Sequence, residues 1–274
     1  MTIQDKLNTL QNYIARWPNL LIAYSGGVDS TFLLKVATDT LSEKARGIIG
    51  VSPSLAKREL NEALQVAQEF GLYVDTINTQ EMADPNYRSN PDNRCYFCKK
   101  ELFSEIYDYA RQHGFNYIAD GTNGDDVGDH RPGLQAAEEL QIRSPLKDAR
   151  LSKSEIRQLS QELGLPTWNK PEMACLSSRF PTGVAITDAG LQQVEKAEDF
   201  LKQLGFQQLR VRHHDKIARI EVRQKELPEI VKEKMRTKID AYLKSLGYTF
   251  VTIDLAGYRR GSLSNAESQA NQHQ

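Results

Sequence analysis

The segment SGGVDS, residues 25–30, constrains the fold of this chain more than any other feature of the sequence. It follows the short apolar run NLLIAY and precedes TFLLKVATDTL, which is predicted to be helical. Gly26 and Gly27 allow the backbone to turn tightly and to bring N–H groups close to a ligand. The helix N-terminus behind them favours an anion. The order of strand, loop and helix therefore predicts a phosphate-binding loop rather than a plain glycine turn.

The polar side chains of the same loop complete the predicted site. Ser25 and Ser30 add hydroxyl donors, whereas Asp29 would repel a phosphate and is expected to hold the loop or a Mg²⁺ ion. The loop lacks the lysine that follows the last glycine of a Walker motif. It instead resembles the PP-loop of ATP pyrophosphatases, which holds the β,γ-pyrophosphate of ATP while the α-phosphate is attacked. This resemblance implies an enzyme that attaches AMP to its substrate and releases pyrophosphate, with Asp29 in a catalytic role.

Two further segments resemble nucleotide-binding parts of that family. Ser52 ends the second predicted strand, where PP-loop proteins usually recognise adenosine. DGTNGDD at 120–126 follows the fourth predicted strand and resembles the second nucleotide segment, so Thr122 and Asn123 are expected to bind ATP. Both positions agree with the rule that open α/β sheets bind ligands at the carboxyl ends of their strands. Three acidic residues stay open as Mg²⁺ ligands or as a solvated loop: Asp125, Asp126 and Asp129.

The alternation of strands and helices predicts an α/β fold, with an open parallel sheet covered by helices on both faces. The four strands are expected at 19–24, 46–52, 72–77 and 116–120. The polar stretch 79–94 is rich in Pro and Asn and is expected to be a long loop, followed by a helix at 98–113.

The pattern changes after about residue 180. A helix at about 187–204, two alternating strands, a charged helix at 228–246 and a last strand indicate a small α+β domain. We therefore expect a PP-loop domain at 1–180, a smaller α+β domain for substrate binding or oligomerisation at 181–264, and a disordered polar tail at 265–274.

The cysteines form the second informative group. Cys95 and Cys98 stand in NRCYFCKKELF at the entrance to a predicted helix, and Cys175 stands in PEMACLSSRFPTG. An odd count of 3 without a signal peptide argues against a disulfide framework, and nearby basic residues favour the thiolate form. Three thiolates fit three irons of a 4Fe–4S cluster, or zinc with His113 or His130 as a further ligand. Without a metal, Cys175 alone is a candidate nucleophile or sulfur donor, and three ordinary cysteines are the plain alternative.

Together these segments resemble the LarE family, the ATP-dependent sulfur transferases of nickel-pincer nucleotide biosynthesis. The resemblance rests on SGGVDST, RCYFCKKELF, DGTNGDD with RPG, SPL, GLP-x-W-x-KP and ACLSSRFP-x-G, and runs from about residue 5 to about 262. It implies that one carboxylate of pyridinium-3,5-biscarboxylic acid mononucleotide is adenylylated and that sulfur then displaces AMP. It also implies a homo-oligomer, with a hexamer as the suggested form.

The resemblance implies two sources of sulfur. In one branch of the family, the cysteine that matches Cys175 gives up its own sulfur and becomes dehydroalanine. Members with the extra C-x-x-C resemble cluster-dependent forms, in which three cysteines hold a 4Fe–4S cluster whose open iron carries a sulfide. Because this sequence has Cys95, Cys98 and Cys175, it favours the cluster branch, with all three as metal ligands and Cys175 also as a catalytic residue.

The predicted hairpin of the second domain carries several arginines. Arg210 and Arg212 share one face of the strand LRVRHH, while Leu209 and Val211 are expected to face the core. Arginines on one hairpin suit bidentate contacts with a phosphate and two carboxylates, the groups that the implied substrate offers. Arg210 and Arg212 are therefore expected to bind substrate, against the alternative of a solvated sheet face.

Composition and charge limit the competing functions. The formal net charge is -1, so no global basic field marks a nucleic-acid binder, and this disfavours a tRNA thiolase with the same loop. An amidating synthetase lacks support because no glutaminase domain is evident, and a non-catalytic nucleotide sensor would bind ATP without releasing pyrophosphate. No apolar run is long enough to span a bilayer, and the N-terminus lacks the apolar core of a signal peptide. We therefore expect a cytoplasmic enzyme with a small nucleotide substrate, without a membrane or nucleic-acid partner.

Overall fold

The computed structural model describes residues 1–126, 132–172 and 174–259. Asp129, His130 and the tail predicted at 265–274 lie outside these residues. Contacts within the chain define two compact units. The first unit contains residues 1–81 and the described part of 93–173, and the second contains 82–92 and the described residues from 174 onward. The predicted domain limits at 180 and 264 stay predictions.

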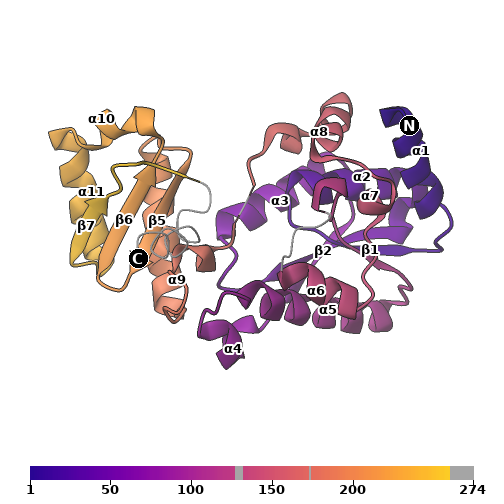
Figure 1. The fold of residues 1–274 in the computed structure, drawn as a ribbon, viewed down its shortest axis with the longest axis horizontal. Helices are drawn as coiled ribbons and strands as arrows, with labels where there is room; N and C mark the ends of the chain where they lie inside the picture. Colours follow the sequence, from indigo (N-terminus) through magenta and orange to yellow (C-terminus); the bar gives the residue numbers. More distant parts are fainter. Residues whose placement is uncertain (127–131, 173, 260–274) are drawn as a thin grey trace, which may run out of the picture. The chain divides into compact units, whose positions relative to one another are not determined.

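A four-stranded parallel sheet forms the centre of the first unit (Figure 1). Its strands are β1 (Leu20–Ala23), β2 (Ala45–Val51), β3 (Val74–Asn78) and β4 (Ile118–Ala119). Their order in the sheet is β3-β2-β1-β4, with neighbouring strands parallel throughout. This arrangement confirms the predicted α/β fold class.

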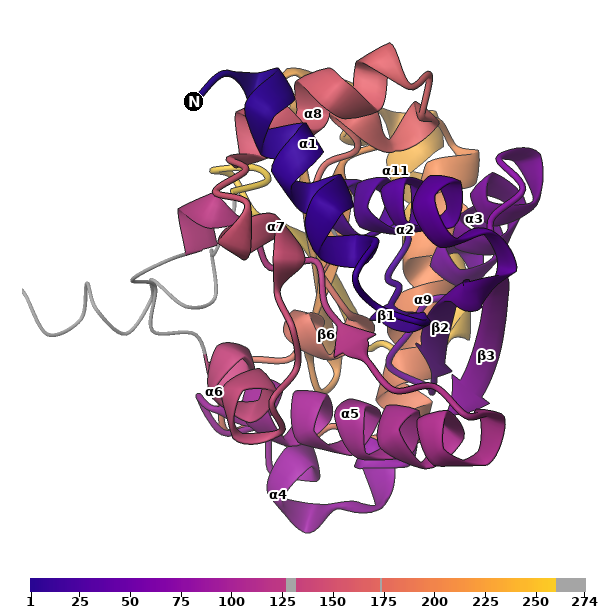
Figure 2. The ribbon, with the colours of Figure 1, turned by 90° about the vertical axis from the view of Figure 1, so that its right-hand side faces the viewer.

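Helices cover both faces of this sheet (Figure 2). One face carries α1 (Ile3–Ile14), α2 (Val28–Leu41), α3 (Lys57–Glu69), α7 (Pro145–Asp148) and α8 (Lys153–Glu162); the other carries α5 (Arg94–His113) and α6 (Pro132–Glu139). Because side chains alternate along a strand, Leu20 and Ile22 of β1 enter the core beneath α2, whereas Leu21 packs with Phe103 and Ile106 of α5. β1 is thus buried on both faces, as its continuous apolar run predicts.

The expected loop at 79–94 is more structured than its composition suggested. It holds a 3₁₀ turn at Glu81–Ala83 and the short helix α4 (Pro85–Arg88). The Asp84 carboxylate accepts a hydrogen bond from the backbone N–H of Asn86 at 2.8 Å, and Pro85 occupies the first helical turn, so both are helix-starting residues. Helix α5 starts at Arg94 rather than at 98, so its first two turns contain both cysteines of the C-x-x-C motif.

The second unit contains a three-stranded sheet of order β5-β6-β7. Its strands are β5 (Leu209–His214), β6 (Ile217–Val222) and β7 (Phe250–Ile253), with β5 and β6 antiparallel and β7 parallel to β6. The helices α9 (Asp188–Gln203), α10 (Leu227–Ile230) and α11 (Glu233–Ser245) pack with it. The helix predicted at 228–246 is therefore two helices. In the part of the chain that the structure describes, no helix is long and apolar enough to cross a bilayer.

The remaining turns are short 3₁₀ segments. They lie at Ser42–Lys44, Gly124–Asp126, Pro166–Asn169, Leu176–Arg179 and Gln224–Glu226. Two of them contain or adjoin predicted site residues.

Candidate active site

The glycine loop leaves the N-terminus of α2 open to an anion. Gly27 is the N-cap residue of α2, and no side chain caps the helix there. The first N–H groups of a helix have no partner within it, so these donors are available to a ligand. Gly26 has a φ of 68°, and a Cβ at this position would lie 2.5 Å from the Cβ of Ala63. The loop therefore requires glycine at this position for both its backbone angle and its packing.

The two serines hold the shape of the loop. Their hydroxyl oxygens lie 3.1 Å apart, and the Ser30 hydroxyl accepts a hydrogen bond from the backbone N–H of Ser25 at 3.2 Å. The Ser25 hydroxyl accepts a hydrogen bond from the N–H of Gly27 at 3.3 Å. The structure thus brings Ser25, Gly27 and Ser30 together at one turn.

Asp29 stands at the start of α2 and forms an ion pair with Lys153. Burial raises the pKa of Asp29 above its ordinary value, and the negative charge of Asp126 adds to this, while Lys153 and Asn123 oppose it. The Asn123 amide nitrogen lies 3.5 Å from an Asp29 carboxylate oxygen. Asp29, Asn123 and Asp126 thus form one polar group beside the phosphate loop.

Lys153 is a site residue that the sequence reasoning missed. The capping box formed by Ser152 and Glu155 starts α8 and places Lys153 at its first position. The backbone N–H of Lys153 also donates to an Asp125 carboxylate oxygen at 2.8 Å. The capping box was visible in the sequence, but the contact with Asp29 joins residues 124 positions apart and leaves no local signal.

The segment 120–126 packs against the phosphate loop. The buried Asp120 carboxylate accepts hydrogen bonds from the hydroxyls of Thr122 at 2.7 Å and Ser144 at 2.9 Å, which fixes the turn. A Cβ at Gly121 would lie 3.1 Å from the backbone nitrogen of Ser30, so the two segments approach closely. Thr122 and Asn123 therefore lie next to the first turn of α2, and their role in binding ATP stays a prediction.

Ser52 lies directly beyond β2, at the same carboxyl edge of the sheet. Its hydroxyl donates to the Glu81 carboxylate, which is buried. Glu81 was assigned to a loop by its polar surroundings and is a second residue that the sequence reasoning missed.

None of the three cysteines forms a disulfide bond. Cys95 is exposed and Cys98 is half-buried, and the two stand one helical turn apart on α5. Half-buried Cys175 precedes the 3₁₀ turn at Leu176–Arg179, and its carbonyl oxygen accepts a hydrogen bond from an Arg179 guanidinium nitrogen at 2.8 Å. Among the described residues, no three His, Cys, Asp or Glu side chains are arranged to hold a metal ion.

Arginines and glutamates form a buried network in the second unit. The guanidinium group of Arg179 makes two hydrogen bonds of 2.9 Å with the carboxylate of Glu198. Arg212 is buried and donates to the Glu221 carboxylate and to the Ser178 carbonyl oxygen, each at 2.9 Å. These contacts hold the turn that follows Cys175.

Arg210 differs from its neighbours in this network. Its guanidinium lies 5.3 Å from the ring centroid of Tyr258, and it donates to the Leu209 carbonyl oxygen at 2.8 Å. No carboxylate within the described chain forms an ion pair with it. Burial lowers the pKa of Arg210, and the positive charge of Arg179 adds to this. Of the two arginines predicted to bind substrate, Arg210 has donors to offer, whereas Arg212 already binds two partners.

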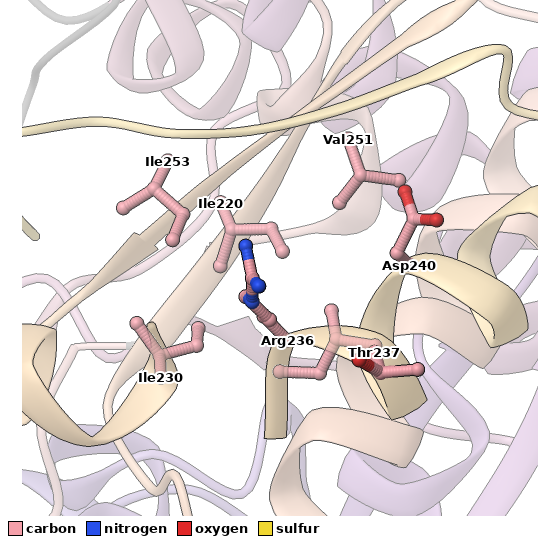
Figure 3. A pocket seen from close by; sticks show the side chains of 8 residues that line it. Ile220, Ile230, Arg236, Thr237, Asp240, Val251 and Ile253 are labelled. Atoms are coloured by element: carbon pink, nitrogen blue, oxygen red, sulfur yellow. The ribbon is translucent and has the colours of Figure 1, made fainter. Parts of the chain in front are cut away.

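A separate pocket of about 340 Å³ lies in the second unit between α11 and the sheet (Figure 3). Figure 3 shows the Arg236 side chain extending toward Ile220 across this pocket. Its lining residues are Ile220, Ile230, Arg236, Thr237, Ile239, Asp240, Val251 and Ile253. This pocket contains none of the residues that the sequence predicted as site residues.

Comparison with known proteins gives matches over nearly the whole chain and matches over about half of it. No known protein-family model matches. An uncharacterized protein of Synechocystis sp. is 47% identical over 96% of this chain and 98% of its own length. Pyridinium-3,5-bisthiocarboxylic acid mononucleotide synthase of Lactiplantibacillus plantarum is 34% identical over 98% of this chain and 97% of its own length. The tRNA-specific 2-thiouridylase MnmA of Desulforamulus reducens is 26% identical over 56% of this chain and 53% of its own length.

Proposed function

The chain belongs to the LarE family of ATP-dependent sulfur transferases, and on that premise we propose that it acts on pyridinium-3,5-biscarboxylic acid mononucleotide. ATP adenylylates one carboxylate of this substrate and pyrophosphate leaves. Sulfur then replaces AMP and leaves a thiocarboxylate. The product serves the nickel-pincer cofactor of lactate racemase.

The uncapped N-terminus of α2 is the observation that carries the adenylylation step. Its free N–H groups, together with the Ser25 and Ser30 hydroxyls, suit the β,γ-pyrophosphate of ATP. A substrate carboxylate oxygen attacks the α-phosphorus, and the bond to the bridging oxygen of pyrophosphate breaks. Mg²⁺ is the expected companion of ATP, and Asp29 would hold it. Lys153 then stands beside Asp29 to offset negative charge.

Activation explains why ATP is needed. A carboxylate is a poor electrophile, whereas an acyl-adenylate carries AMP as a good leaving group. A sulfur nucleophile attacks the acyl carbon, and the bond to AMP breaks. Atoms balance, since ATP, carboxylate and sulfide give AMP, pyrophosphate and thiocarboxylate.

The three cysteines suit a 4Fe–4S cluster by their chemistry. Cys95 and Cys98 share one turn of α5, where Cys95 is exposed and Cys98 is half-buried, and Cys175 is half-buried as well. Three thiolates would hold three irons and leave the fourth iron to carry the sulfide that the reaction consumes. In the described residues no arrangement of three ligands stands in place, so the donor set alone supports this cluster. Sulfur supplied by Cys175 itself is the alternative.

The cluster assignment is tested by purification without oxygen, followed by iron and sulfide analysis. The protein should be brown and contain iron and acid-labile sulfide, and Cys95→Ala, Cys98→Ala and Cys175→Ala should each lose the cluster. Tyr96→Phe, between the two cysteines of α5, is the matched control and should keep it. With added sulfide the enzyme should turn over repeatedly.

Mass spectrometry of the peptide with Ala174-Cys175-Leu176 after reaction separates the two sulfur sources. The cluster proposal expects an intact Cys175. One product per chain together with dehydroalanine at Cys175 would overturn the cluster and leave the sulfur transferase standing.

Arg210 is proposed to bind a phosphate or carboxylate of the substrate. Arg210→Ala should weaken substrate binding by about 1.5–3 kcal/mol, the contribution of one charge-assisted contact, and leave ATP binding unchanged. Arg212 is proposed as a second substrate contact, but Arg212→Ala would also remove its hydrogen bonds to Glu221 and to the Ser178 carbonyl oxygen. Calorimetric titration of both ligands makes the measurement, with exposed Arg236→Ala as the control. Unchanged substrate affinity in Arg210→Ala returns this arginine to a structural role.

We further propose that the protein is a cytoplasmic homo-oligomer, with a hexamer as the suggested form, and that it has no nucleic-acid or membrane partner. The near-neutral net charge of -1 supports the absence of a tRNA substrate. The similarity to the tRNA enzyme covers 56% of this chain, whereas the similarity to the mononucleotide synthase covers 98% of it. The shorter match therefore does not favour tRNA over the mononucleotide as substrate.

A further inference from the structure

Glu81 is a buried carboxylate for which the proposed mechanism has no use. It begins the 3₁₀ turn that follows β3, and the residue is 3% exposed. Its Oε1 accepts hydrogen bonds from the hydroxyls of Ser52 and, at 2.7 Å, Ser54. No Lys, Arg or His within the described chain forms an ion pair with it. A buried carboxylate without a cation is costly unless hydrogen-bond donors surround it.

The hydroxyl protons of Ser52 and Ser54 are already engaged in hydrogen bonds with the Glu81 carboxylate. A serine hydroxyl has one proton to give, and those of Ser52 and Ser54 point to Glu81. The backbone N–H of Ser54 donates to the Ser52 hydroxyl at 3.2 Å. What the three side chains still present are acceptor sites, including Glu81 Oε2, which receives no hydrogen bond from the described residues. A ligand that binds there must bring N–H or O–H donors.

The position of the group relates it to ATP. Val51 at the end of β2 pairs with Asn78 at the end of β3, so the residues that follow both strands stand at the carboxyl edge of the sheet. β1, whose carboxyl end leads into the phosphate loop, is the next strand beyond β2. Neighbouring strands are about 4.8 Å apart, so β3, which precedes Glu81, is about two strand spacings from β1, and the Ser52 and Ser54 that bind the Glu81 carboxylate follow the nearer strand β2. This is within the reach of a nucleoside whose phosphates occupy the loop.

We propose that Glu81 is a specificity-determining residue, which accepts hydrogen bonds from the donor groups of the adenosine half of ATP. Those groups are the ribose hydroxyls and the exocyclic amine of adenine. Ser52 and Ser54 fix the carboxylate so that Oε2 faces the nucleoside. The inference rests on the proposed use of ATP, and it assigns to a carboxylate a role that the phosphate loop cannot perform, because the loop recognises only the anionic end.

Equilibrium titration with Mg²⁺-ATP tests this role. Glu81→Gln keeps the size of the side chain and removes its charge, and it should weaken ATP binding about tenfold. Glu62→Gln on α3, where the Glu62 side chain is 45% exposed, is the matched control and should bind ATP as the wild type does. Thermal unfolding of each variant verifies that it is folded.

Three analogues identify the donor: 2′-deoxy-ATP, 3′-deoxy-ATP and the triphosphate of purine riboside, which lacks the exocyclic amine. The analogue without the relevant donor should bind the wild type about tenfold more weakly than ATP, and Glu81→Gln should not weaken it further. Equal weakening of ATP and all three analogues by Glu81→Gln would show a structural role and overturn the proposal. Unchanged ATP affinity in Glu81→Gln would overturn it as well.

A failure of the proposed sulfur-transfer function would give a different result from a failure of the Glu81 proposal. ATP would then bind with the expected dependence on Glu81, and no pyrophosphate would be released in the presence of the mononucleotide. If Glu81→Gln does not fold, Ser54→Ala tests the role of Glu81 instead. This variant removes one of the two hydroxyl hydrogen bonds that hold the Glu81 carboxylate. It should weaken ATP and spare the analogue that lacks the donor, and loss of affinity for all ligands alike would contradict the role.

Discussion

Gly26 gives the phosphate loop a backbone conformation that allows its N–H groups to face a ligand. Its φ of 68° lies in the region that favours glycine, and its Cα faces the side chain of Ala63 on α3. The sequence predicted the need for glycine at this turn, because SGGVDS stands between a strand and a helix. The partner of Gly26 could not be predicted in the same way, since Ala63 is 37 positions further along the chain.

Replacing Gly26 with alanine should therefore reduce the free energy of unfolding more than replacing a glycine that has a similar φ but open space around its Cα. Gly26→Ala combines backbone strain with a Cβ–Cβ approach of 2.5 Å, so we expect a loss of more than about 2 kcal/mol in the free energy of unfolding. Gly71→Ala has a φ of 63° and no neighbour within 4 Å, and should lose about 1 kcal/mol. Urea unfolding of both variants makes the comparison. Equal losses would mean that α3 can move away and that packing does not fix the loop.

At the scale of elements, local signals predicted most of the fold. Apolar runs predicted the strands, and the helix expected at about 187–204 is found as α9 at Asp188–Gln203. The short helices α6 and α7 were missed because a helix of 8 or 4 residues shows too little periodicity. The helix predicted at 228–246 is interrupted between Ile230 and Glu233, although no glycine marks the break.

Strand β5 adds a dependence on pH that its sequence alone did not reveal. His213 is 8% exposed, its Nδ1 lies 3.0 Å from the Tyr248 hydroxyl, and its ring packs against Phe180. Burial lowers the pKa of His213 below its ordinary value of 6.5. The unfolded chain therefore binds this proton more readily than the folded one, and stability is lost as the pH falls below 6.5 toward the lowered pKa.

His213→Gln should reduce that loss. The free energy of unfolding of the variant should fall less between about pH 7 and about pH 5 than that of the wild type. His113→Gln, at the C-terminal end of α5, is the control and should follow the wild type. Denaturant unfolding at several pH values gives the slopes. Identical slopes for His213→Gln and the wild type would show that the folded protein accommodates the protonated ring without cost.

At the scale of the whole molecule, the chain divides its chemistry between two units. The first contains the phosphate loop, Asp29, Lys153 and the Glu81 group, and the second contains Cys175 and the arginine network. The fold class and the ATP loop were predictable because they depend on short, ordered segments. The pairs that complete the sites were not, since Asp29 meets Lys153 and Arg212 meets Ser178 only through the folded chain.

The central claim is that ATP is cleaved to AMP and pyrophosphate in order to place sulfur on a carboxylate. It is tested most directly by incubating protein purified without oxygen with Mg²⁺-ATP, sulfide and pyridinium-3,5-biscarboxylic acid mononucleotide, and quantifying all products. We predict one AMP and one pyrophosphate for each thiocarboxylate formed, with none of the three when the mononucleotide is omitted or when Asp29→Ala replaces the wild type. Formation of ADP and phosphate, or of thiocarboxylate without ATP, would contradict the account.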